Sequence, residues 1–217
     1  MKREKISSNV IRRLPRYLRK LDDLAYNGVD RISSSELGRM MGLTPSQIRQ
    51  DFSCFGEFGQ QGYGYNIETL RKELSNILGV NCNYNIILIG TGNLGHALIE
   101  NFGFGGHGFT LLAAFDIKKS LIGTQFAGVS IYDINTLPDF LAENKVDIAV
   151  LTSPRRSAHS TASLVASCGV RAIWNFTNTE LELEDPNVLV EDIHFSDSLL
   201  ALSYYLTETS APNAKDK

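Results

Sequence analysis

The sequence of 217 residues contains little of what several common site chemistries need. It has three cysteines, one tryptophan and four histidines. The cysteines, Cys54, Cys82 and Cys168, stand far apart and follow no ligand spacing, which argues against a disulfide framework or a zinc site. We expect them to be reduced and buried. The histidines are scattered and form no recognisable acid–base pair, so no catalytic residue and no metal site is predicted.

Long apolar runs are absent as well. No run reaches the roughly 18 residues that a membrane-spanning helix needs. The first ten residues are charged but lead into no apolar segment of the kind found in secretory signals. With 43% hydrophobic and 21% charged residues, the composition is that of an ordinary globular protein. The sequence therefore predicts a cytoplasmic protein.

Charge is distributed unevenly along the chain. Residues 1–80 hold thirteen Lys and Arg against nine Asp and Glu, whereas residues 81–217 hold eight against fifteen. This asymmetry indicates that only the first part binds a polyanion, although a solvated basic tail would give the same balance.

Apolar residues recur at helical spacing near the N-terminus and predict an amphipathic helix with a basic face. The apolar positions are Ile11, Leu14, Leu18, Leu21 and Ala25, and the basic ones between them are Arg12, Arg13, Arg16, Arg19 and Lys20. Pro15 fits only near the first turn of such a helix, or marks a kink.

Two short helices joined by a glycine-containing turn are predicted next. Ser33 and Glu36 have the spacing of a capping box, and Gly42 suits the end of the first helix. Thr44 begins the second helix, with Pro45 at its first position. This pattern is typical of a helix-turn-helix.

The second of these helices has an apolar face, formed by Ile48, Phe52 and Phe55, and a polar face. Arg and Gln side chains match the guanine and adenine edges that the major groove displays. The uneven charge and the short turn favour DNA reading over a plain solvent-facing side. The predicted DNA-binding residues are Ser46, Gln47, Arg49, Gln50 and Ser53, joined by Arg12 of the basic helix.

Aromatic residues and glycines alternate from Glu57 to Asn66, which is typical of a tight two-stranded hairpin. A hairpin after a DNA-reading helix is a wing, and its tip can reach an adjacent groove or phosphate. The predicted tip residues are Gln60, Gln61 and Gly62. A helix from Ile67 to Leu78 then completes a winged-helix domain over residues 1–80, and residues 81–85 form a linker.

The stretch IILIGTGNLGHAL, residues 86–98, combines a buried parallel strand with the spacing G-x-G-x-x-G. Gly90 would make the tight turn, Gly92 would let the backbone approach a pyrophosphate, and Gly95 would let the helix pack closely on the strand. Thr91, Asn93 and Leu94 belong to the same predicted cofactor-binding loop.

A second predicted strand, residues 110–115, ends at Asp116. This carboxylate would accept hydrogen bonds from both ribose hydroxyls and repel a 2′-phosphate, which favours NAD or NADH over the phosphorylated cofactors. Lys118, also a predicted cofactor-binding residue, and Lys119 weaken that preference.

Later apolar runs at residues 129–132, 146–152 and 170–174 predict further strands of a Rossmann-like, doubly wound parallel sheet over residues 85–190. The fold class is therefore α/β with an additional winged-helix domain. Ligands bind at the carboxyl ends of such strands, where the predicted cofactor-binding residues are Thr152, Ser153, Pro154, Asn175 and Phe176. Pro154 and Phe176 would equally suit plain loop and core roles.

Residues 191–208 form a final predicted helix that is apolar over most of its circumference. Such a helix must be buried, either against a partner subunit or against its own chain. We interpret residues 191–210 as a dimerisation helix, which would also pair two helix-turn-helix units on two DNA half-sites.

No substrate domain remains after these three parts, so the protein is not predicted to be an enzyme. A small NAD-dependent oxidoreductase with a fused helical domain is the alternative.

The combination of segments resembles the Rex family of redox-sensing transcriptional repressors. The segments are RQDFSCFGEFGQQGYGY, GTGNLGHAL, AAFD, LTSP and WNFT, in that order. The resemblance implies a homodimer that binds inverted-repeat operator DNA, is released by NADH and binds in the presence of NAD⁺. It also implies a C-terminal helix exchanged between subunits, DNA contacts from Arg49 and Ser53, and a place for Phe195 near the nicotinamide.

The sequence departs from that family at several positions. Gln50, and Gln60 with Gln61, stand where the family usually has basic residues, which would lower DNA affinity, flatten its salt dependence or change operator preference. Where the family uses a tyrosine for switching, this sequence has Asn101 or Phe102, and where the family uses an acid, it has His194. A repressor without a redox response is therefore a third interpretation.

Overall fold

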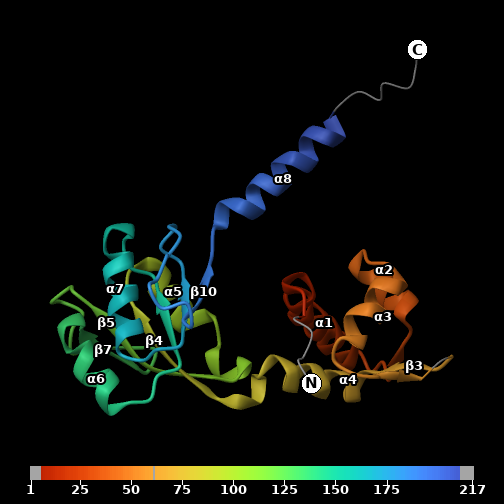
Figure 1. The fold of residues 1–217 in the computed structure, drawn as a ribbon, viewed down its shortest axis with the longest axis horizontal. Helices are drawn as coiled ribbons and strands as arrows, with labels where there is room; N and C mark the ends of the chain where they lie inside the picture. Colours follow the sequence, from red (N-terminus) through yellow and green to blue (C-terminus); the bar gives the residue numbers. More distant parts are fainter. Residues whose placement is uncertain (1–5, 61, 211–217) are drawn as a thin grey trace. The chain divides into compact units, whose positions relative to one another are not determined.

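The structure, a computed structural model, describes residues 6–60 and 62–210 (Figure 1). The chain divides into two compact units, and the point of division along the sequence lies between Asn83 and Tyr84. We refer to them as unit 1, which precedes this point, and unit 2, which follows it.

The described residues of unit 1 contain four α-helices, the 3-10 helix η1 (Val80–Cys82) and a small antiparallel sheet of strand order β1-β3-β2. The helices are α1 (Ser8–Tyr26), α2 (Ser34–Met41), α3 (Pro45–Ser53) and α4 (Ile67–Leu78). The strands are β1 (Arg31–Ile32), β2 (Gly59–Gln60) and β3 (Gly64–Asn66). The predicted helix-turn-helix followed by a hairpin is confirmed, and β1 is a third strand that the sequence pattern did not reveal.

The turn between α2 and α3 forms as the capping residues predict. Ser33 Oγ accepts a hydrogen bond from Glu36 N, and Glu36 Oε2 accepts one from Ser33 N, each at 3.1 Å. Gly42 ends α2 in the left-handed region at φ +69°. Thr44 Oγ1 accepts from Gln47 N at 3.2 Å and begins α3.

The buried face of α1 differs from the prediction. Ile11 is 49% exposed, and the core is instead reached by Val10, Leu14, Tyr17, Leu21 and Leu24. Tyr17 was not among the predicted apolar positions, because tyrosine carries a polar hydroxyl group. In the structure its ring is buried and its hydroxyl group is hydrogen-bonded to Asp51. Pro15 lies in the interior of α1 and not in its first turn.

Unit 2 is built on a seven-stranded sheet of order β10-β9-β8-β4-β5-β7-β6. The strands are β4 (Tyr84–Ile89), β5 (Phe109–Asp116), β6 (Gln125–Phe126), β7 (Val129–Asp133), β8 (Ile148–Leu151), β9 (Ala172–Asn175) and β10 (Leu189–Asp192). All neighbours are parallel except β6 and β7. The six parallel strands, numbered along the chain, follow the spatial order 3-2-1-4-5-6 of dinucleotide-binding sheets.

Helices cover both faces of this sheet. They are α5 (Asn93–Asn101), α6 (Leu137–Glu143) and α7 (Arg155–Ser167), with short 3-10 helices η2 (Phe104–His107) and η3 (Ile134–Thr136). Successive residues of β4 face opposite layers: Ile87 packs in the cluster of α6 and α7, whereas Ile86 and Leu88 pack in the cluster that contains Ile99 of α5. Burial on both faces explains the continuous apolar run of this strand.

Two predicted boundaries were wrong. Tyr84 and Asn85 begin β4, so the linker is shorter than residues 81–85. The boundary at residue 191 falls inside β10, because Glu191 and Asp192 pair with β9. This edge strand alternates exposed and half-buried residues, and the apolar run at its start, residues 188–190, is only three residues long.

The expected burial of the cysteines was also wrong, since Cys54 and Cys82 are exposed and Cys168 is half-buried.

The last helix, α8 (Phe195–Ser210), is exposed along the whole length from Phe195 to Thr209. Its large apolar side chains remain 54–67% exposed, and they are Phe195, Leu199, Leu200, Leu202, Tyr204, Tyr205 and Leu206. Within residues 6–60 and 62–210, no helix has the length and apolarity needed to cross a bilayer.

Candidate functional site

The α3 helix of unit 1 presents polar side chains on the side away from its core. Ile48 and Phe52 are buried, whereas the predicted DNA-binding residues Ser46, Arg49, Gln50 and Ser53 are exposed. Arg49 donates from Nη1 to Ser34 Oγ at 3.0 Å and from Nη2 to Ser46 Oγ at 3.2 Å. The guanidinium is therefore held at the surface between α2 and α3.

A groove of about 820 Å³ runs between α3 and the β2–β3 hairpin. Arg49, Ser53 and Gly62 line it, so the structure brings predicted residues of the helix and the hairpin together. Gln60 pairs with Gly64 across the hairpin, and Gln61 lies outside the described residues. Arg12 is exposed on α1.

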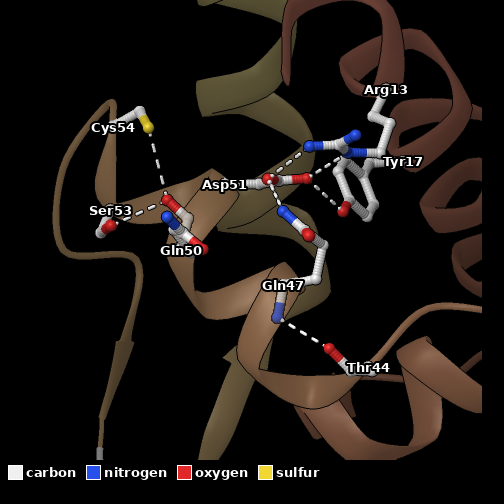
Figure 2. Close-up of polar contacts among 8 residues, drawn as sticks. All are labelled: Arg13, Tyr17, Thr44, Gln47, Gln50, Asp51, Ser53 and Cys54. Atoms are coloured by element: carbon white, nitrogen blue, oxygen red, sulfur yellow. Dashed lines mark hydrogen bonds and ion pairs between the residues drawn. The ribbon is translucent and has the colours of Figure 1, made fainter. Parts of the chain in front are cut away.

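Gln47 differs from the other predicted residues of α3. Its amide Nε2 donates to Asp51 Oδ1 at 2.8 Å, which turns the side chain toward α1 (Figure 2). Asp51 also accepts hydrogen bonds from Arg13 Nε and Nη2, at 2.6 and 2.8 Å, and from Tyr17 OH at 2.7 Å.

Asp51 has no exposed surface, yet it is ionised. Burial raises the pKa of Asp51, but the hydrogen bonds from Arg13, Tyr17 and Gln47 lower it by more, so the net shift is downward. Sequence reasoning missed this group. The available signal was an acid on the apolar side of α3, next to Phe52 in the chain.

In unit 2, the three glycines of the loop after β4 have distinct surroundings. Gly90 has φ +100°, and a Cβ atom there would lie 2.7 Å from Ser153 N. A Cβ atom on Gly95 would overlap the carbonyl oxygen of Gly90, whereas one on Gly92 would meet nothing within 4 Å. The turn and the close helix packing thus require glycine at two positions, and Gly92 leaves open space.

Asp116 follows at the end of β5 and is tied to this loop. Its Oδ2 accepts from Thr91 N at 2.6 Å and from Thr91 Oγ1 at 2.7 Å, and its Oδ1 accepts from Lys118 N at 2.8 Å. Burial raises the pKa of Asp116, but these bonds lower it further than burial raises it, so the carboxylate is ionised. An ionised carboxylate offers about four acceptor positions, so capacity for further hydrogen bonds remains.

A cleft of about 620 Å³ lies where β4, β5 and β8 end, at the point where the strand order reverses direction. The predicted residues that line it are Gly90, Thr91, Gly92, Asn93, Asp116, Lys118, Thr152, Ser153 and Pro154. Leu94 and Gly95 are not among its lining residues. Ser153 Oγ is buried, and among the described residues it has no hydrogen-bond partner, so it is available to a ligand.

The cleft also has lining residues that sequence reasoning did not select, including His96 on α5 and Arg156 on α7. The His96 ring lies 4.3 Å from that of Phe126. Arg156 was predictable in principle, because it lies in the first turn of α7, the helix that follows β8. In parallel sheets of this kind, the N-termini of such helices lie at the ligand site.

Besides Leu94 and Gly95, three more predicted cofactor-binding residues, Asn175, Phe176 and Phe195, are not among the residues that line this cleft. Asn175 is buried; its Nδ2 donates to Thr179 O and Asp192 Oδ1, both at 2.6 Å, and its Oδ1 accepts from Thr177. The Phe176 ring lies 6.0 Å from that of Phe195. The Asn175 amide thus joins β9 to β10 within the protein.

Comparisons with known proteins agree with both units. Residues 5–53 match the family model described as putative DNA-binding protein N-terminus, and residues 81–179 match the CoA binding domain. A relative from Thermoanaerobacter pseudethanolicus, a redox-sensing transcriptional repressor Rex, is 49% identical over 95% of this chain and 92% of its own length. The Rex protein of Clostridium acetobutylicum is 46% identical over 96% of this chain and 97% of its own length.

Solved structures give the same result. The chain is similar to RSP in complex with beta-NAD⁺ and operator DNA, with a TM-score of 0.89, 48% identity, and coverage of 95% of this chain and 94% of that one. It is also similar to RSP in complex with beta-NADH, with a TM-score of 0.88, 45% identity, and coverage of 95% and 96%.

The fold and the two sites define a transcription regulator in which a helix-turn-helix unit precedes a dinucleotide-type sheet. With 49% identity over 95% of its length, the chain belongs to the Rex family of redox-sensing transcriptional repressors. The resemblance drawn from the sequence motifs is thereby confirmed.

Proposed function

We propose that this chain is a dimeric repressor that binds operator DNA through unit 1 and NAD or NADH through unit 2, and that NADH releases the DNA. The observation that carries the proposal is the cleft at the switch point of the sheet, with the open backbone at Gly92 on one side and the Asp116 carboxylate on the other. RSP, a similar protein, has been solved with NADH and with NAD⁺ and operator DNA.

The residues of the cleft fit a dinucleotide. The N-terminus of α5 and the open space at Gly92 suit a pyrophosphate, and Asp116 suits the ribose hydroxyls. The unpartnered Ser153 Oγ offers a further hydrogen bond to the ligand. Thr91, Asn93, Lys118, Thr152 and Pro154 complete the proposed contacts along the cleft.

Asn175, Phe176 and Phe195 do not line the cleft, so we propose a different role for this part of the protein. Because the Asn175 amide is already hydrogen-bonded within the protein, this residue would shape the nicotinamide end of the site rather than bind the ligand with its side chain. Gly95 acts through the close packing of α5 on the loop, and Leu94 belongs to the first turn of the same helix.

The DNA contacts are proposed for the exposed side of α3 and the hairpin. Arg49, Gln50 and Ser53 face outward on α3, and Arg49 and Ser53 line the groove beside the hairpin. Ser46, Arg12 and the hairpin residues Gln60, Gln61 and Gly62 would contact the backbone or an adjacent groove.

The proposed dimer forms through α8. A helix whose apolar side chains are exposed on all sides is not stable as a solvated element, and a second copy supplies the missing surface. Two copies also place two α3 helices on the two halves of an inverted repeat. We place this repressor in the cytoplasm, where the chromosome is.

We further propose that the nucleotide is sensed and not turned over. The alternative, a small oxidoreductase, draws on one observation, namely that His96 lines the cleft. Steady oxidation of NADH with a panel of carbonyl compounds would support that alternative.

Fluorescence anisotropy of a labelled palindromic operator, at fixed salt, tests the proposal. NADH is expected to release the DNA and NAD⁺ to leave it bound, because a ligand shifts an equilibrium only through different affinities for its two states. Tight DNA binding that ignores both nucleotides would refute redox gating and support a repressor that has lost its sensor function.

The same titration tests whether two residues that differ from the family's usual ones, Asn101 and His194, prevent the response to NADH. Asn101 Nδ2 donates to Ala97 O within α5 at 3.1 Å, and His194 Nδ1 lies 3.2 Å from Asn178 Oδ1. Release by NADH would mean that neither substitution prevents switching.

A further inference from the structure

The carboxylate of Asp51 is saturated with hydrogen bonds. Oδ1 accepts from Arg13 Nη2 and Gln47 Nε2, and Oδ2 accepts from Arg13 Nε and Tyr17 OH, at distances of 2.6–2.8 Å. These bonds fill about four acceptor positions, which is the full capacity of an ionised carboxylate. Figure 2 shows the donors converging on Asp51 from two elements, α1 and the first turn of α3.

This network fixes α3 in two ways. The paired bonds from Arg13 hold one edge of the carboxylate, and a planar guanidinium fork tolerates little displacement. Rotating or sliding α3 would break those bonds and leave a charge buried without a partner, which is strongly unfavourable. Tyr17 also contacts α3 through its ring, whose centroid lies 4.9 Å from that of Phe52.

Gln47 belongs to this network rather than to the outward side of α3. Gln47 and Asp51 stand four residues apart, so their side chains lie together on the helix. Ser46 and Arg49 are joined by a hydrogen bond on the exposed side of α3, where Gln50 is exposed as well. Gln47 is half-buried and its amide donates inward. A side chain held in this way is poorly placed to read a base edge.

We propose that Asp51 is the positioning residue of the DNA-reading helix, and that Gln47 acts on DNA recognition through Asp51 and not through a base contact. The inference rests on the proposed function, because it presupposes that α3 meets operator DNA.

A double-substitution cycle tests it. Operator affinity is measured by anisotropy for Gln47→Ala, Asp51→Asn and the pair, with a duplex of unrelated sequence as the second ligand. Asp51→Asn is expected to weaken operator binding about tenfold, a loss comparable to that caused by one mismatched base pair. Affinity for the unrelated duplex and its salt slope should stay nearly unchanged, because no phosphate contact is lost.

The operator affinity of the double variant, compared with those of the two single variants, decides whether Gln47 acts through Asp51. If Gln47 acts through Asp51, the double variant binds operator no more weakly than Asp51→Asn alone, because residues in one network are not additive. If Gln47 contacts a base directly, the two losses multiply, and the assignment of Gln47 is overturned. Operator binding by Asp51→Asn as tight as that of the unsubstituted protein would overturn the role of Asp51.

Asp22→Asn is the matched control. It breaks an ion pair between Arg71 and Asp22, 2.6 Å long, that joins α1 to α4 and leaves α3 untouched. Operator affinity should be unchanged in this variant, whereas an equal loss in both variants would mean that any disturbance of α1 weakens DNA binding, which would also overturn the proposal.

Tyr17→Phe covers the case in which Asp51→Asn does not fold, as judged by circular dichroism. It removes one hydrogen bond to Asp51 and keeps the ring against Phe52. A roughly threefold loss of operator affinity that disappears in the Gln47→Ala background supports the network, and independent losses contradict it. Failure of the proposed function is recognised separately, because the unsubstituted protein would then show no preference for operator.

Discussion

Gly92 and Gly95 stand three residues apart in one turn but differ in the space around them. A side chain at Gly92 would project into open space at the cleft, whereas a methyl group at Gly95 would overlap the Gly90 carbonyl. The same substitution therefore has different consequences for binding and for stability at the two positions.

Gly92→Leu is expected to abolish NADH binding in isothermal titration calorimetry while changing the thermal midpoint little. Gly95→Ala is the matched contrast, and overpacking there is expected to destabilise unit 2 by about 1–3 kcal/mol. Normal NADH binding by Gly92→Leu would show that the cofactor site lies elsewhere.

The buried carboxylate of Asp51 predicts a pH dependence of stability. Its pKa in the folded protein lies below the ordinary value of 3.8, because its hydrogen bonds outweigh the opposing effect of burial. At pH values above the ordinary pKa, the ionised carboxylate therefore stabilises the folded state. This stabilisation is lost as the pH falls through the lowered pKa of the folded protein.

The urea midpoints of the unsubstituted protein and Asp51→Asn should accordingly differ most near neutral pH and converge as the pH falls below about 4. Asp116 and Asp147 have lowered pKa values as well, but both proteins share them. A difference that stays constant across the acid range would contradict the assignment.

At the scale of elements, α8 is a helix of unit 2 whose large apolar side chains are not covered by the rest of that unit. Leu199 is 67% and Leu202 is 54% exposed on this helix. If α8 pairs two copies, a charge at Leu202 would be buried in the interface without a partner, which costs several kcal/mol.

Leu202→Glu is expected to convert dimers to monomers in analytical ultracentrifugation and to weaken operator binding, since one α3 helix then meets one half-site. Leu189→Glu, at a residue of β10 that is 71% exposed, is the control and should leave the dimer intact. Equal dimerisation of both variants would rule out α8 as the interface.

Elements with a local signature were predictable from the sequence. Ser33, Thr44 and Gly42 act within one turn of the chain, and the apolar run of β4 reflects its burial on both faces. The strands β1 and β6 are two residues long, and the edge strand β10 begins with an apolar run of only three residues, so their conformation depends on their pairing partners more than on a local signature.

Within the proposed sites, the structure brings the glycine loop and Asp116 together at one cleft, and the sequence could predict this arrangement because each lies at the carboxyl end of a strand of the sheet. Asp51 and Asn175 were not understood, because each depends on pairing between distant parts of the chain. Arg13 and Asp51 are 38 positions apart, and Asn175 and Asp192 are 17 apart. Sequence periodicity carries no information about such pairs.

At the scale of the whole molecule, the two proposed ligands must affect each other equally. If NADH lowers the affinity for operator DNA by some factor, DNA lowers the affinity for NADH by the same factor, which is typically about 5–150. Operator titrations with and without saturating NADH, and calorimetric NADH titrations with and without operator, should give matching ratios. Unequal ratios would mean that DNA release involves a further species, such as a change in the number of subunits.

Trp174 has a consequence for how occupancy can be observed. It is the one tryptophan of the sequence and lies on β9, with its ring 4.6 Å from that of Phe176 and 5.1 Å from that of Phe102. The adjacent strand β8 ends at the cleft. Reduced nicotinamide absorbs indole emission and oxidised nicotinamide does not, so energy transfer from Trp174 would give each subunit an intrinsic optical signal for the redox form it holds.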